Sequence, residues 1–486
     1  MDSAIATMDS AIAAMNATVG IPAGASRNAI RDSIFHSMMT TNKSGSSLFF
    51  ESDDIGHVLA NVAIVLTTSG ALISADMMKR VLSGCIHSSD YVSYKSRCCV
   101  SAVANMVTEE CKSVIAERIP EIIKHYSGNR NILVWGLDVA LMVCPFCISH
   151  DSFMGNMIGT AVGDAVGLPV EGFERDVCIK YVQQIVQPMM MSTYHRHNFT
   201  FGQYSDDTQL TREMYLTVLQ GKGKIDPTVY GLRIAMLFQP NAYRVVGYGN
   251  QTARAADALR NGIHYSESGC SKGQGNGSVM RSACLGVLLA NKTKDEIINT
   301  AKVMSSITHA SPACLDGAVS IALAAHYSMA TRDLPFDHAH FIQYVASGVS
   351  SDFAVYVQEL LTLRDMSLAD AAKRIIEIGI SNKERSWGNG ISVGARQTAL
   401  WSLWSFMRSP DSFVDCMCNA IGVGGDVDTT AATAGGIIGS RVGAAAIPSI
   451  WKSCLHDYTE WNFEQLCEIG NKVYELVKTK SVVVHN

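Results

Sequence analysis

Residues 424–436 of this 486-residue chain carry a pattern of side chains that is suited to chemistry. Asp426 and Asp428 stand one residue apart, two glycines precede them and two threonines follow. Two carboxylates that lie close together repel one another unless a proton or a cation lies between them. Hard oxygen ligands of this kind suit Mg²⁺, Mn²⁺ or Ca²⁺. Because Asp is favoured near a helix start, the stretch predicts a glycine-rich loop entering a helix, with Asp426, Asp428 and Thr429 on its first turn.

A second cluster of hydroxyl and carboxylate groups lies at residues 205–209, where Ser205 is followed by Asp206 and Asp207. Apolar residues such as Leu210 and Met214 recur behind it at helical spacing, so it too is predicted to open a helix. Helix N-capping explains either cluster taken alone. Metal binding explains both together, because the two clusters could supply an all-oxygen site for two ions about 3.5–4 Å apart.

Five blocks of the sequence, taken in chain order, resemble the ADP-ribosylglycohydrolase family. This family includes dinitrogenase-reductase-activating glycohydrolase and the ADP-ribosylserine and ADP-ribosylarginine hydrolases. The resemblance covers about residues 151–475 and departs at Ser205, where the family usually has Thr, although the hydroxyl is kept. The blocks are residues 159–171, 205–209, 275–281, 308–310 and 424–436, with a weaker sixth at 446–448.

The resemblance implies a compact all-α domain that hydrolyses the bond between the anomeric carbon of ADP-ribose and an acceptor. Such cleavage passes through an oxocarbenium-like state. Two Mg²⁺ or Mn²⁺ ions would orient the ribose and lower the pKa of a bound water, so no protein nucleophile is needed. The implied catalytic carboxylates are Glu171, Asp207 and Asp426, and the implied metal ligands are Ser205, Asp206, Asp207, Asp426, Asp428 and Thr429. The implied ligand-binding residues are Asp164, which is expected to act from behind the metal ligands, and Gly275, Asn276, Gly277, Ser278, Met280 and His309.

Two other functions remain open on the sequence. A catalytically inactive ADP-ribose-binding or structural protein, like the lens crystallin relatives of this family, could keep the carboxylates without turnover. A two-metal phosphoester hydrolase would use similar ligands. The presence of four aspartates together with Glu171 favours the glycohydrolase. The implied partner is an ADP-ribosylated protein or a small ADP-ribosyl compound, and the motifs leave the acceptor group open.

Several local features predict how the site is positioned. Gly159, Gly163 and Gly167 recur every fourth residue, which predicts a helix face that another backbone approaches closely. The glycine-rich run at 273–277 precedes a helix predicted at 278–290 and is a candidate anion site for the diphosphate or distal ribose. Ser311 and the following proline predict a helix start just after His309.

The rest of the chain bounds the class of protein. A net charge of −5 and a pI near 6.3 argue against nucleic-acid binding. The 14 cysteines are scattered, and an isolated CxxC at 144–147 is a weak metal or redox signal, so reduced thiols in an intracellular, cytoplasmic protein are expected. The apolar run at 55–75 contains polar residues and predicts a buried helix rather than a membrane span. We expect a flexible or weakly helical segment at 1–47, a mostly helical domain of unknown function at 48–150, and the glycohydrolase-like domain at 151–486.

Overall fold

The computed structural model describes residues 75–86, 96–97, 100–101, 104, 108–143, 148–192, 199–239, 245–378, 390–458, 460–479 and 483–484. The expected segment at 1–47, the apolar run at 55–75 except its last residue, and the CxxC at 144–147 lie outside these residues. The chain divides into two units, residues 1–147 and 148–486.

The described part of the first unit is helical. It contains α4 (Ala75–Gly84), α6 (Glu109–His125) and α7 (Arg130–Val143). The side chain of Thr108 caps α6 by accepting a hydrogen bond from the Cys111 amide, as is typical of threonine at this position. Helix α6 packs against both α4 and α7.

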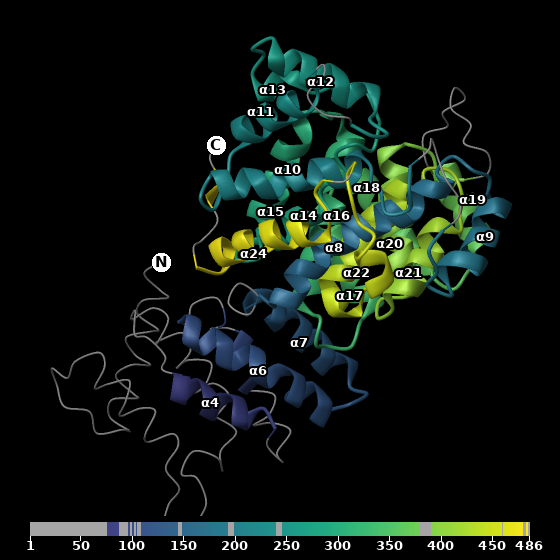
Figure 1. The fold of residues 1–486 in the computed structure, drawn as a ribbon. Helices are drawn as coiled ribbons and strands as arrows, with labels where there is room; N and C mark the ends of the chain where they lie inside the picture. The colour runs from purple at the N-terminus through teal and green to yellow at the C-terminus, as the bar shows by residue number, and fades with distance from the viewer. Residues whose placement is uncertain are drawn as a thin grey trace, which may run out of the picture. The chain divides into compact units, whose positions relative to one another are not determined.

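The second unit is all-α, as predicted (Figure 1). In the described residues its only strands, β1 (Lys224–Ile225) and β2 (Val483–Val484), pair in parallel. The helices around the site are α8 (His150–Gly167), α10 (Asp206–Gln220), α12 (Asn250–Arg260), α16 (Pro312–Ala330), α20 (Ala395–Arg408) and α22 (Val427–Val442). The other helical elements are η2 (Leu168–Val170), α9 (Arg175–Tyr181), η3 (Val182–Val186), α11 (Pro227–Leu237), α13 (Tyr265–Ser268), α14 (Ala283–Leu288), α15 (Lys294–Ser306), α17 (His338–Ala346), α18 (Ser351–Leu363), α19 (Leu368–Ile378), α21 (Phe413–Ile421), η4 (Ala444–Ala446), α23 (Ser449–Lys452) and α24 (Phe463–Thr479).

Helices α8 and α22 pack backbone to backbone along their lengths, and both are buried in the second unit (Figure 1). A Cβ on Gly159 would collide with the carbonyl oxygen of Gly435, and one on Gly163 with that of Ala431. A Cβ on Gly167 would lie 2.6 Å from the Cα of Asp428. The predicted close approach is therefore confirmed, and it places the start of α22 beside the end of α8.

The helix predicted at 278–290 is shorter than expected, because α14 begins only at Ala283. The Arg281 guanidinium donates a hydrogen bond to the carbonyl oxygen of Gly277. In a regular helix that carbonyl would accept from the amide four residues on. Residues before Ala283 form turns instead, with the Val279 and Met280 amides both bonded to the carbonyl of Asn276.

Helix α20 contributes two tryptophans to the core. Trp401 and Trp404 are fully buried and stack with ring centroids 4.5 Å apart. Each indole N–H donates to a backbone carbonyl, at 3.2 Å and 2.9 Å respectively. Among the described helices, none is both long enough and apolar enough to cross a bilayer.

Candidate active site

The start of α10 is fixed by Ser205, as expected for a helix N-cap. Its hydroxyl accepts a hydrogen bond from the Asp207 amide at 3.3 Å and lies 2.8 Å from the Asp207 carboxylate, to which it donates. Asp206 and Asp207 occupy the first turn, where the helix dipole favours negative charge. Capping therefore explains Ser205, and both carboxylates remain available for a second task.

The start of α22 is not explained by capping. Asp426 occupies the N-cap position, but its side chain makes no capping hydrogen bond. Instead its carboxylate accepts from the Asn276 side-chain amide at 2.6 Å. Asp428 lies in the first turn and accepts from the Thr429 amide at 2.9 Å.

A glycine turn brings Glu171 to the same place. Gly424 and Gly425 have φ of +77° and +84°, a conformation that glycine adopts without strain. The Gly425 amide donates to the carbonyl of Phe173 at 2.9 Å, and the Gly172 amide donates to the carbonyl of Gly425 at 2.7 Å. The loop that carries Glu171 is thereby tied to the loop that precedes Asp426.

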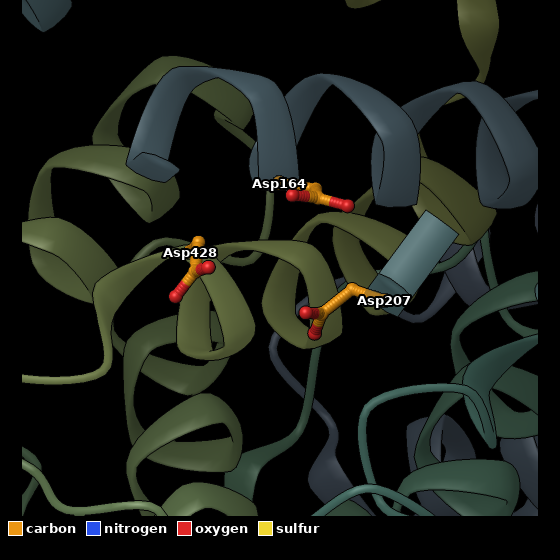
Figure 2. Close-up of side chains that lie close together, drawn as sticks. All are labelled: Asp164, Asp207 and Asp428. Atoms are coloured by element: carbon orange, nitrogen blue, oxygen red, sulfur yellow. The ribbon is translucent and has the colours of Figure 1, made fainter. Parts of the chain in front are cut away.

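Carboxylates from three helices converge at this point. Figure 2 shows Asp164 of α8, Asp207 of α10 and Asp428 of α22 lying close together. Each contributes an oxygen that lies within 4.8 Å of the others, and all three residues are buried. Glu171, Asp426 and Asp428 form a second group with the same spacing, so Asp428 belongs to both.

Asp164 holds the start of α10 from behind. It is fully buried and accepts hydrogen bonds from the Ser205 amide, at 3.0 Å, and from the amide and hydroxyl of Thr208, at 3.0 Å and 2.6 Å. Burial, followed by the neighbouring Asp428 charge, raises the Asp164 pKa to about 8. Asp164 thus links α8 to the start of α10 beneath the cluster.

The cluster has an excess of negative charge. Burial and the neighbouring carboxylates raise the pKa values of Asp206, Asp207 and Asp426 well above the usual value. None of these three makes an ion pair with a lysine or arginine in the part of the chain that the structure describes. The Oδ1 atom of Asp207 is buried and has no hydrogen-bond partner among the described residues. Buried carboxylates in this state require protons or cations, so the donor set fits hard divalent ions.

A pocket of about 240 Å³ opens over the carboxylates. Predicted site residues that line it are Glu171, Asp206, Asp207, Gly275, Asn276, Gly277, Met280, His309, Asp426, Asp428 and Thr429. Three predicted residues do not line it: Asp164, Ser205 and Ser278 are all fully buried behind it. The pocket therefore unites both acidic clusters with the 275–280 loop and His309.

The glycine-rich loop at 273–277 differs from the expected anion site. It does not precede a helix directly, and two of its amides are already used, since Gly275 donates to Gln251 at 2.8 Å and Asn276 donates to Val393 at 3.0 Å. The expectation that it presents a helix N-terminus to an anion is wrong, because α14 starts only after the turns described above.

His309 lies just ahead of α16, whose N-cap is Ser311, as predicted. Burial, and then the Arg281 charge, lowers its pKa to about 3. The imidazole is therefore neutral at ordinary pH, and Nδ1 is held 2.7 Å from the hydroxyl of Thr308. This suits a hydrogen-bonding contact in the pocket wall.

The sequence reasoning missed residues 247–252, which form one wall of the pocket, and Val393. This wall leads into α12, whose N-cap residue is Gly249. Gly247, Tyr248 and Gly249, just before an amphipathic helix that begins at Asn250, were the signal that could have identified it.

Residues 148–482 match the family model described as ADP-ribosylglycohydrolase. Because this match covers more than half of the chain, the protein belongs to the ADP-ribosylglycohydrolase family. ADP-ribosylhydrolase ARH3 of Homo sapiens is 25% identical over 343 residues, which are 64% of this chain and 91% of the relative. ADP-ribosylarginine hydrolase Tri1 of Pseudomonas putida is 24% identical over 306 residues, covering 62% and 73%. An uncharacterized protein of Archaeoglobus fulgidus is 26% identical over 331 residues, covering 67% and 97%.

Proposed function

We propose that this protein is a Mg²⁺-dependent hydrolase that cleaves the glycosidic bond between ADP-ribose and an acceptor and releases ADP-ribose. The acceptor is a protein side chain or a small molecule. The observation that carries the proposal is the meeting of Asp206 and Asp207 with Asp426 and Asp428 in one pocket, beside Glu171. Family membership supports the reaction class.

The residues that would hold the ions are Asp206 and the two overlapping carboxylate groups, with Asp428 common to both groups. The unpartnered, buried oxygen of Asp207 is the strongest single sign that this site binds a cation. When bound, two divalent ions supply Lewis acidity and lower the pKa of a coordinated water. Thr429 and Ser205 add hydroxyl oxygens at the two helix starts, and Thr429 Oγ1 lies 3.4 Å from the Asp207 carboxylate.

The protein's own groups divide the remaining work. Glu171 lies on a loop at the edge of the carboxylate group and is proposed to accept the proton of the attacking water. The pocket is lined by no Lys or Arg among the described residues. The diphosphate of ADP-ribose is therefore proposed to meet backbone N–H groups at the start of α12, where a helix N-terminus favours an anion.

The names of the relatives leave the acceptor open. One of them is an ADP-ribosylarginine hydrolase, whereas the name of ADP-ribosylhydrolase ARH3 gives no acceptor. A panel of peptides with ADP-ribose linked to Ser, Arg or Glu, incubated with and without Mg²⁺ and analysed by mass spectrometry, tests the proposal. We expect free ADP-ribose from at least one linkage with Mg²⁺ and none in EDTA. Full turnover in EDTA would refute the metal requirement, and release of phosphate or AMP would indicate a phosphoester hydrolase. Tight binding of ADP-ribose without turnover of any peptide would indicate a catalytically inactive binding protein.

A further inference from the structure

Gln209, the last residue of the acidic block, faces away from the pocket and is fully buried. Its side-chain amide makes hydrogen bonds in two directions. The Nε2 atom donates to both carboxylate oxygens of Asp457, each at 3.0 Å. The Oε1 atom accepts from the backbone amide of Val246 at 3.2 Å.

Val246 immediately precedes the pocket wall at 247–252. Its carbonyl accepts from the amide of Asp206 at 2.8 Å, so the backbone of Val246 is bonded to α10 through both of its polar groups. Gly247 follows with φ of +79°, and a Cβ there would lie 3.3 Å from an oxygen of Asp206. The far end of the wall is tied separately, through the bond between Gln251 and the Gly275 amide.

Asp457 is the fixed end of this connection. It is fully buried and also accepts from the Arg212 guanidinium at 3.1 Å and from the Gln203 side chain at 3.0 Å. The Arg212 guanidinium in turn lies 4.7 Å from the ring centroid of Trp461. A buried polar network of this kind holds its members in one arrangement when every group is satisfied.

We infer that Gln209 is a positioning residue that connects Asp457 to Val246 and so sets the position of the ADP-ribose-binding wall at 247–252. This inference rests on the proposed function only for the identity of the ligand. Gln209 does not line the pocket, and its side-chain amide bonds to Asp457 and Val246 rather than to the groups proposed to hold metal. Its loss therefore affects the binding of ADP-ribose more than the binding of Mg²⁺ or the chemical step.

The test is Gln209→Met, which keeps the length of the side chain and removes its donor and acceptor. We expect the Kd for ADP-ribose, measured by calorimetry, to rise about five- to tenfold, as follows from one lost hydrogen bond to an ordered loop. KM should rise to a similar extent while kcat and the Mg²⁺ affinity stay within about twofold. Amide hydrogen exchange in residues 245–252 should become faster.

Gln203→Met is the matched control. Gln203 is of the same type, is buried, and donates to the same Asp457 carboxylate at 3.0 Å, but it makes no bond to Val246. It should lower stability like Gln209→Met and leave both the ADP-ribose Kd and the exchange at 245–252 unchanged. Should Gln209→Met not fold, Asp457→Asn serves as the second variant, because an amide in place of one carboxylate oxygen weakens the anchor of Gln209 and keeps its volume.

The inference is overturned if exchange at 245–252 is unchanged in folded Gln209→Met, or if Gln203→Met changes it equally. If Gln209 only stabilised the fold, Gln209→Met would lower kcat in proportion to the fraction of folded protein and leave the Kd for ADP-ribose unchanged. If the wild-type protein does not bind ADP-ribose at all, the proposed function fails, and hydrogen exchange alone still decides whether Gln209 orders the wall.

Discussion

Asp207 and Asp428 come from the first turns of two different helices, and their carboxylate oxygens lie within 4.8 Å of each other deep in the protein (Figure 2). Neither helix start requires this contact for its own stability. The side chain of Ser205 caps α10, and the start of α22 uses no side-chain cap at all. The juxtaposition costs free energy in a protein without cations, and this cost is the physical sign of a site built for ligands.

Neutralising one proposed ligand from each helix should abolish turnover. We expect Asp207→Asn and Asp426→Asn each to reduce kcat/KM for an ADP-ribosyl peptide by at least about a hundredfold, because loss even of groups that only support metal ligands costs 10- to 100-fold. Asp415→Asn is the control, since Asp415 is an exposed first-turn residue of α21. Near-normal turnover by either site variant would show that the two clusters do not act together.

The meeting of the two acidic stretches could be predicted. Adjacent carboxylates repel one another and raise the free energy of the folded protein unless they bind a common cation. The close approach of another backbone to α8 was also predictable, since Gly159 and Gly163 recur on one face and a helix interior otherwise disfavours glycine. That the partner is α22 came from the structure. These signals are local, and each depends on a few residues of unusual type at fixed spacing.

The wall at 247–252 and the short α14 could not be predicted in the same way. The wall is held in the pocket by contacts with distant parts of the chain: Gln209 accepts a hydrogen bond from the Val246 amide, and Gln251 of the wall accepts one from the Gly275 amide. Helix α14 is shortened where the Arg281 side chain donates to the carbonyl of Gly277. In the helix predicted from the apolar pattern, that carbonyl would accept from a backbone amide. Side-chain hydrogen bonds to the backbone of this kind leave no periodic trace in the sequence.

Metal binding should stabilise the protein in a way that depends on Asp428. At a Mg²⁺ concentration of 100 times Kd, binding to the folded state alone adds about 2.7 kcal/mol. We expect Tm to rise with Mg²⁺ in the wild type and hardly at all in Asp428→Asn, because Asp428 belongs to both carboxylate groups. In EDTA the variant should be at least as stable as the wild type, since one of several mutually repelling charges is gone. Equal Mg²⁺ dependence of Tm in the two proteins, measured by scanning calorimetry, would contradict the shared site.

The close packing of α8 on α22 predicts a large effect of a single methyl group. Gly163→Ala places a Cβ against the carbonyl of Ala431, and neither backbone can move without displacing the acidic helix starts. We expect a loss of more than about 2 kcal/mol in the free energy of unfolding, in the range of overpacked cores. Gly394→Ala is the control, because φ there is −83° and the nearest atom to an added Cβ is 3.4 Å away. Urea denaturation of both variants measures the difference, and similar midpoints would argue against the tight contact.

Buried histidines outside the carboxylate cluster predict how the free energy of unfolding depends on pH. His326 is almost fully buried in α16, with Nδ1 2.9 Å from the Tyr344 hydroxyl, and burial lowers its pKa to about 4 from 6.5. Above pH 6.5 the imidazole is neutral in both states and contributes nothing. As pH falls from 6.5 towards 4, the unfolded chain takes up a proton that the folded protein does not, so stability decreases, by up to about 3 kcal/mol for this residue. His309 acts in the same direction, so His326→Gln should remove part of the loss rather than all of it. Unfolding free energies in urea at several pH values between 7.5 and 4.5 test this, and parallel curves for the wild type and His326→Gln would show that His326 takes up its proton in the folded state as well.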